Sequence, residues 1–134
     1  MKRIGSFLAV ACCVAAMSVA ASAATCNSNN SGAWNTAGNW SCGHVPNAAD
    51  DVVIATTHAM TYNPGTGTIL SLTINGTGSL RFNDNSSDTL TVTGSVTNNG
   101  TIFGGDGPGN RTHTLAIGGN FTNNGTLTAA IGDD

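Results

Sequence analysis

Side chains that could carry acid–base or metal chemistry are few in this sequence. Its seven acidic residues include the adjacent pair Asp50 and Asp51. Neighbours in a strand point to opposite faces, so these two carboxylates cannot act on one substrate bond. Asp84 and Asp88 flank a polar segment, 85–87, and their oxygens suit calcium. A solvated polar turn also explains this pair, and we favour the turn.

A third carboxylate, Asp106, lies in the glycine-rich segment 104–110, which is faintly similar to a calcium-binding nonapeptide roll. Such rolls require tandem copies, and the sequence holds one. We therefore expect a flexible loop. Asp84, Asp88 and Asp106 are only weak calcium candidates, and no cofactor is predicted.

Basic residues give no better support for catalysis. His44, His58 and His113 are far apart and follow no zinc spacing. A polysaccharide lyase pairs a Lys or Arg base with calcium-binding acids, but nothing in the sequence places Arg81 or Arg111 beside acids. We predict no catalytic residue, and a polysaccharide lyase or hydrolase is the enzymatic alternative.

Aromatic side chains offer a binding chemistry. Trp34, Trp40 and Tyr62 could form a platform on which sugar rings stack. Tryptophans at the open end of a repetitive fold more often close its core, because they bury a large apolar area. We favour this plug over the glycan-stacking platform.

The N-terminus indicates the compartment. Lys2 and Arg3 precede an apolar stretch, 7–20, which ends in small residues. This order predicts a signal peptide over residues 1–23, and the stretch is too short for a permanent membrane span. We expect a secreted or cell-surface protein, with the periplasm as the other location, and no transmembrane segment after cleavage.

Two cysteines remain after this leader. Cys26 and Cys42 form an isolated even pair, and such pairs in exported proteins usually form disulfides. The bond would staple an irregular N-terminal cap over residues 24–49. A reactive thiol is the functional alternative, which we regard as much less favoured.

The composition of residues 24–134 predicts an all-β fold. Removing Lys2 and Arg3 changes the formal net charge from −3 to −5, and no Lys remains. Clustered basic residues are thus missing, which argues against nucleic acid as a partner. Thr, Val and Ile favour strands, while Gly and Asn favour turns.

An internal repeat predicts the architecture. The segment 90–102, LTVTGSVTNNGTI, returns as LAIGGNFTNNGTL at 115–127, with the same offset at every position. Strand-rich repeats of this length are typical of solenoids. We predict a short right-handed parallel β-helix of about three coils over residues 50–134, with a hairpin sandwich as the competing fold. Stacking would place Val92 over Ile117, Val96 over Phe121, Ile102 over Leu127, and Asn98 and Asn99 over Asn123 and Asn124.

A family resemblance supports this fold. The segment 38–54, GNWSCGHVPNAADDVVI, is followed by Leu70-x-Leu72-x-Ile74-x-Gly76 and Leu80-x-Phe82. Together they resemble the opening of bacterial secreted right-handed β-helix proteins and the eight-glycine domain of large extracellular proteins. The later Asn-Asn-Gly-Thr coils are similar to autotransporter passengers. The resemblance implies extracellular display and often adhesion, within a pectin lyase-like fold, and it transfers no catalytic residue.

Threonines raise a further alternative. Thr89, Thr91 and Thr93 would share one face, as on an ice-binding solenoid. In the second copy of the repeat, Ala116 and Gly118 replace Thr91 and Thr93, which interrupts the array. Ice binding is therefore a remote alternative.

The predicted role is a non-catalytic adhesin or structural module that meets surface glycans or host and cell-surface proteins. A carbohydrate-binding or polysaccharide-degrading β-helix is the main alternative. No polar cap follows Leu127, and solenoid ends need one. We expect either a fragment of a longer passenger, which we favour, or end-to-end self-association.

Overall fold

The computed structural model describes residues 23–105 and 111–129, which form short strands and one 3-10 turn, η1 (Ala37–Asn39). In this described part no helix is long and apolar enough to cross a membrane. The predicted leader, residues 1–23, lies outside the described residues except for residue 23. The strands are β1 (Thr25–Asn27), β2 (Gly32–Ala33), β3 (Asp51–Ile54), β4 (Ala59–Tyr62), β5 (Thr66–Ile69), β6 (Ser71–Ile74), β7 (Ser79–Phe82), β8 (Thr89–Val92), β9 (Val96–Asn98), β10 (Thr101–Phe103), β11 (Thr114–Ile117), β12 (Phe121–Asn123) and β13 (Thr126–Thr128).

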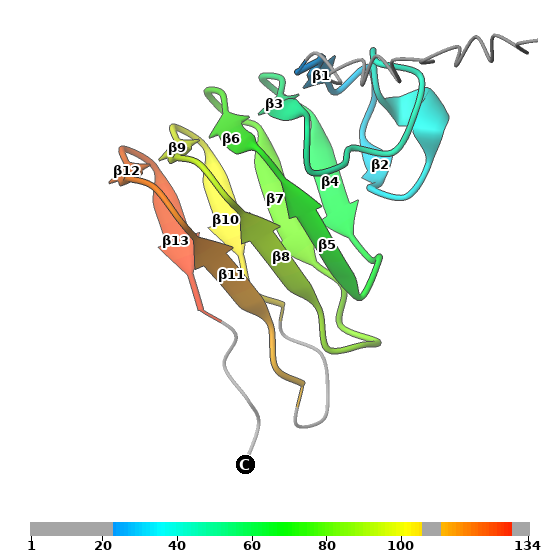
Figure 1. Cartoon of the computed structure of the whole chain (residues 1–134). Helices are drawn as coiled ribbons and strands as arrows, with labels where there is room; N and C mark the ends of the chain where they lie inside the picture. Colours follow the sequence, from blue (N-terminus) through cyan, green and yellow to red (C-terminus); the bar gives the residue numbers. More distant parts are fainter. Residues whose placement is uncertain (1–22, 106–110, 130–134) are drawn as a thin grey trace, which may run out of the picture.

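The strands build a parallel β-solenoid with three faces (Figure 1). One sheet has the order β1-β3-β6-β9-β12, a second β13-β10-β7-β4-β2, and a third β11-β8-β5. Strands β3 to β11 make three complete coils, while β1–β2 and β12–β13 add a partial coil at each end. The predicted β-helix is confirmed, and the partial coils extend it from about three coils to about four turns.

The core consists of columns of inward-facing side chains, one from each coil. Leu72 lies over Val52, and Val96 lies over Leu72 in register. Buried and more exposed residues alternate along these strands, as expected for a sheet with one apolar face. All strand pairs are parallel, so the hairpin sandwich is excluded.

The stacking predicted from the repeat is confirmed. The register places Ile117 beside Val92, Phe121 beside Val96 and Leu127 beside Ile102. In the last partial coil, Phe121 and Leu127 are 41% and 53% exposed, because no further described coil covers them.

Three aromatic residues from successive coils form one column along the solenoid. Trp34 directly follows β2, and Tyr62 and Phe82 are the last residues of β4 and β7. The three lie in register, with ring centroids 5.2 and 5.4 Å apart. The next position in this column is Gly104, which supplies no ring. The ring of His113, from the segment before β11, takes the vacant place 5.5 Å from Phe82.

The N-terminal cap covers one end of this column. Trp40 packs edge-on against Trp34 at 4.8 Å and donates its indole N–H to the Trp34 carbonyl at 2.8 Å. The disulfide joins Cys26 of β1 to Cys42, whose Cα atoms are 4.9 Å apart. The predicted disulfide and the plug by the two tryptophans are both found here.

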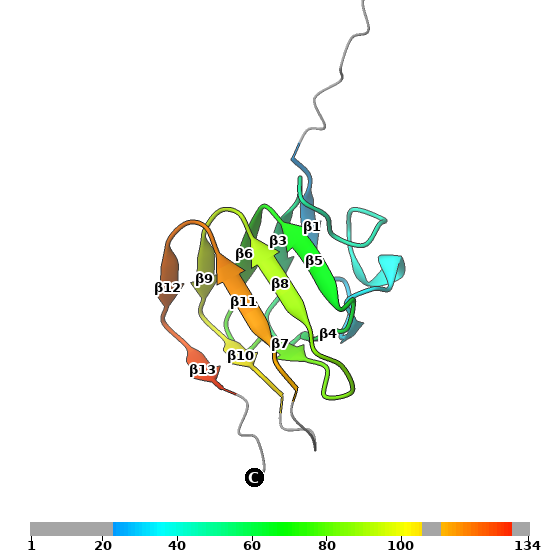
Figure 2. The same cartoon turned by 60° about the horizontal axis from the view of Figure 1, so that its bottom comes forward.

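The three corners of each coil differ in length. Residues 63–65, 83–88 and 104–113 connect the second sheet to the third, so this corner lengthens along the solenoid (Figure 2). The corner from the third sheet to the first is residue 70 alone after β5, and it is residues 93–95 after β8 and 118–120 after β11. The corner from the first sheet to the second shortens to two residues in the later coils, 99–100 and 124–125.

Glycine is required at the corner between the first and second sheets. A Cβ on Gly100 would lie 2.9 Å from Ile74 Cγ2 and 3.0 Å from the Gly76 carbonyl oxygen, and nearer still to that of Gly78. Gly125 stacks on Gly100 in the same way. Backbone of successive coils therefore fills the space that any side chain would need.

Asparagine ladders hold the same corner together. Asn98, which is fully buried, donates from Nδ2 to Asn123 Oδ1 at 2.8 Å and to the Thr126 carbonyl at 2.9 Å. Its Oδ1 accepts from the Gly100 amide at 3.1 Å. On the surface, Asn124 donates to Asn99 Oδ1 at 3.0 Å, so both predicted Asn pairs are confirmed.

We predict that Gly100→Ala destabilises the solenoid by about 1–3 kcal/mol, because the new methyl group overpacks the corner. Gly38→Ala is the matched control, since a Cβ there meets no atom within 4 Å. Thermal unfolding followed by circular dichroism measures both. Equal melting temperatures for the two variants would contradict the tight corner.

We predict that Asn98→Ala costs about 1–3 kcal/mol, because it leaves the Gly100 amide and the Thr126 carbonyl without their buried partner. Asn99→Ala removes one exposed hydrogen bond and should cost less than about 1 kcal/mol. Urea unfolding measures the difference. A larger loss for Asn99→Ala would mean that the surface ladder is the more important one.

Candidate functional site

The carboxylates proposed for calcium are engaged in separate contacts. Asp84 forms an ion pair with Arg81 on the surface, a pairing that the sequence analysis did not anticipate. Asp88 is fully buried, and its Oδ1 accepts from the Gly65 amide at 2.9 Å and from Ser86 Oγ at 3.2 Å. Asp106 lies outside the described residues. The solvated turn that we favoured is therefore wrong for Asp88, which instead anchors two loops inside the fold.

Asp88 belongs to a buried polar cluster with Tyr62 and His113. The Tyr62 hydroxyl donates to the Thr89 carbonyl at 3.0 Å. His113 Nδ1 lies 3.8 Å from Asp88 Oδ2 and has no hydrogen-bond partner in the described structure. Burial, and secondarily the negative charge of Asp88, raise the pKa of Tyr62 from 10.0 to about 12. This cluster holds a phenol in its neutral form.

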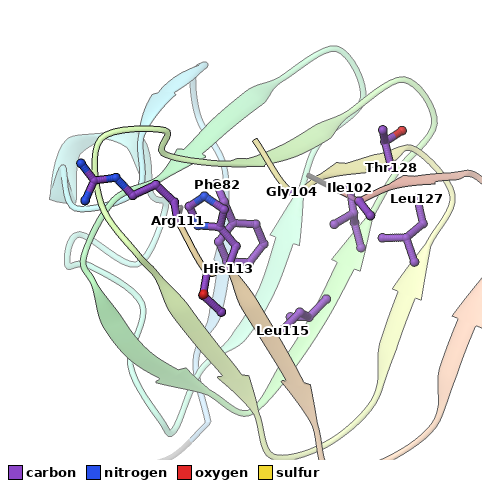
Figure 3. A pocket seen from close by; sticks show the side chains of 10 residues that line it. Phe82, Ile102, Gly104, Arg111, His113, Leu115, Leu127 and Thr128 are labelled. Atoms are coloured by element: carbon purple, nitrogen blue, oxygen red, sulfur yellow. The ribbon is translucent and has the colours of Figure 1, made fainter. Parts of the chain in front are cut away.

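Next to this cluster, a cavity of about 360 Å³ opens at the last coil (Figure 3). Ile102, Leu115 and Leu127 give it apolar walls, while Arg111 extends at its far side. The other lining residues are Phe82, Gly104, Thr112, His113, Thr128 and Ala129. Among the residues that the structure describes, the cavity thus lies at the open end of the core, and the nearly buried ring of His113 is in its wall.

The N-terminal cap holds the other polar cluster. His44 Nε2 lies 2.9 Å from Asp50 Oδ2 and 4.0 Å from Cys26 Sγ. Asp50, 2% exposed, also accepts from the Asn47 amide at 2.9 Å. Among the described residues, one group of three potential metal ligands comes together: Cys26, Cys42 and His44, with ligand atoms within 4.8 Å of one another. We did not predict this group, although Cys42-Gly43-His44 is a visible signal.

The proposed glycan-stacking platform needs a correction. Trp34, Trp40 and Tyr62 are 1%, 1% and 0% exposed, so they are interior residues rather than a surface platform. Each ring packs against other rings of the aromatic column, and sugar cannot reach their faces without unfolding the cap.

Threonines line the third sheet more regularly than the sequence repeat indicated. Thr66, Thr89 and Thr114 form one outward column across β5, β8 and β11. Thr68 and Thr91 form the next column, which ends at Ala116 as predicted. The sequence did not predict the threonines of β5. This strand, TGTI, has only one apolar side chain, and fewer residues separate it from β8 than separate β8 from β11.

We predict that the single tyrosine of the chain, Tyr62, ionises in the folded protein with a midpoint at about pH 12. Tyrosinate absorbance measures this midpoint, and in denaturant it should fall to about 10. Because the folded state keeps a proton that the unfolded state loses, stability should decline as the pH rises above 10.

A midpoint near 10 in the folded protein would contradict the buried cluster. Asp88→Asn serves as the second measurement, because it removes the smaller cause of the shift. The midpoint should then fall only part of the way, since burial remains the larger cause.

Comparison with known proteins adds a family. No curated protein and no solved structure matches the chain. A family model, described as a domain of unknown function (DUF8693), matches residues 25–107. This span contains the N-terminal cap from residue 25 onward and the strands β1 to β10, and it covers more than half of the 134 residues. The chain therefore belongs to the DUF8693 family.

Proposed function

We propose that this protein is a non-catalytic module of adhesin or structural type, displayed outside the cell or on its surface. The observation that carries the proposal is the state of its carboxylates. In the described residues each of the four Asp side chains has an internal partner. These partners are His44 and Asn47 for Asp50, Ser71 for Asp51, Arg81 for Asp84, and Gly65 and Ser86 for Asp88. These contacts support a role of the four carboxylates in the fold, and we extend this to the proposal that none of them acts on a substrate.

Two features support a location outside the cell. The Cys26–Cys42 disulfide is of the kind that persists in oxidising compartments. The basic and apolar order of residues 1–23 is that of a signal peptide. Both features agree with the resemblance to autotransporter-type passengers. We include the extracellular display that this resemblance implies in the proposal.

The outward faces suggest what such a module would bind. Thr73, Thr97 and Thr122 form a column on the first sheet, and other threonines line the third sheet. Hydroxyl and amide groups on a rigid, weakly charged surface can exchange hydrogen bonds with the hydroxyls of glycans or with exposed protein strands. We therefore propose surface glycans or cell-surface proteins as partners.

The purified protein, residues 24–134, tests this proposal on a glycan array and in a polysaccharide depolymerisation screen. We predict retention on one or more glycans without shortening of any polymer. Thr97→Lys, in the centre of the first-sheet column, should weaken retention at least about tenfold if that face binds. Depolymerisation that disappears in Asp84→Ala, with the melting temperature unchanged, would contradict the non-catalytic role.

A second candidate function, ice binding, is favoured by one observation. The columns Thr66–Thr89–Thr114 and Thr68–Thr91 place hydroxyl and methyl groups at the strand spacing of about 4.8 Å on one sheet. Such a regular array can order water into a lattice. Thermal hysteresis tests it: Ala116→Thr should increase any hysteresis and Thr91→Lys should abolish it, whereas Thr73→Lys on the first sheet should not. A freezing point equal to the melting point in Ala116→Thr would eliminate this candidate.

A further inference from the structure

The N-terminal staple brings together the donor atoms of a metal site. Cys26 Sγ, Cys42 Sγ and a ring nitrogen of His44 lie within 4.8 Å of one another. A fourth donor, Asp50 Oδ2, is 2.9 Å from His44 Nε2. Two thiolates, an imidazole and a carboxylate are the ligand types that bind zinc tetrahedrally. In the described structure the two sulfurs are joined to each other, so the set is complete only after reduction.

The orientation of His44 fits the role of a ligand. Its Nδ1 lies 3.1 Å from the Cys42 carbonyl oxygen, and its Nε2 lies 4.0 Å from Cys26 Sγ. Histidines that bind metals commonly donate their second ring N–H to a backbone carbonyl, which fixes the ring. Nε2 can then bind an ion in place of its present contact with Asp50 Oδ2, which lies on the same side of the ring.

Besides the opening of the disulfide, separations of up to 4.8 Å between the ligand atoms have to shorten by about 1 Å. With bonds of about 2.0–2.3 Å, ligand atoms around a tetrahedral zinc ion lie roughly 3.3–3.8 Å apart. The contact of 4.0 Å between Cys26 Sγ and His44 Nε2 is close to this range, and the 2.9 Å contact with Asp50 has to widen slightly. Asp50 is buried and held by the Asn47 amide, so its oxygen stays in place.

Backbone contacts keep the two cysteines together without the disulfide. Cys26 lies in β1, which pairs with β3. The segment before Cys42 is tied to β1 and its continuation by hydrogen bonds from the Ser41 amide to Asn27 and from the Asn29 amide to Asn39, both 2.8 Å. Reduction therefore leaves two thiols on a preformed frame.

We propose that reduction converts this staple into a site for a thiophilic divalent ion, zinc, with Cys26, Cys42, His44 and Asp50 as ligands. An external dithiol reductant gives up two electrons and two protons and becomes a disulfide, while Cys26 and Cys42 become thiols. The ion then displaces both thiol protons. The disulfide thus holds the cap in oxidising surroundings, and a metal ion holds it in reducing ones. This inference does not depend on which partner the outer faces of the solenoid bind.

Cobalt(II) is the probe, because its thiolate complexes absorb in the near ultraviolet and tetrahedral complexes absorb in the visible. The experiment titrates cobalt into residues 24–134, reduced with excess dithiol that is then removed under argon. We predict both absorption bands at one ion per chain, their loss on adding zinc, and no thiolate band in the oxidised protein. Zinc should also raise the melting temperature of the reduced chain.

Variants separate this site from metal bound by two loose thiols. His44→Gln keeps the disulfide in the oxidised form and should weaken cobalt binding at least about tenfold, with loss of the visible band. His58→Gln is the control, since that histidine lies in the corner between β3 and β4 and contacts Ser28 of the cap instead. Equal cobalt binding by His44→Gln and the unchanged chain would overturn the proposal. So would a reduced chain that binds no cobalt, whether folded or unfolded.

Discussion

The in-register stacking of parallel coils is the constraint on which the rest of the structure depends. A coil has no interior of its own, and it buries its apolar side chains only against those of its neighbours. Val52, Leu72 and Val96 must therefore occupy equivalent positions although unequal lengths of chain separate them. At a tight corner, the backbone of one coil contacts the backbone of the next. This contact leaves no room for a Cβ, which requires glycine, and it buries the Gly100 amide, which Asn98 satisfies with a hydrogen bond.

Much of this fold was predictable because the later coils repeat almost residue for residue. Val92, Val96 and Ile102 and their equivalents identified the columns, and Asn98 and Asn99 identified the ladders. The earlier coils were harder, since β5 offers only Ile69 as a fully buried apolar side chain. The vacancy at Gly104, filled by His113 from another segment, depends on three-dimensional packing and has no sequence period.

The polar clusters were less predictable than the strands for a similar reason. Asp88 was expected in an exposed turn because Asn and Ser precede it, yet it lies against the 63–65 corner of the preceding coil and is fully buried. His44 and Asp50 were seen separately, and only the path of the cap brings them to the cysteines. The spacing of residues in a sequence predicts contacts within a strand or between repeats of equal length. These clusters join segments that belong neither to one strand nor to equal repeats.

The unequal corners of the coil have a consequence for how this fold can change. The connections of residues 63–65, 83–88 and 104–113 lengthen from one coil to the next while the strands that they join stay in register. The two-residue glycine corners of the later coils, 99–100 and 124–125, have less freedom, because an added residue would separate backbone that is stacked in contact. The edge with the longest connections is therefore where insertions are best tolerated. Each coil can present a different loop there, at a fixed spacing of about 4.8 Å set by the backbone, so the edge is a natural place to diversify or to graft peptides.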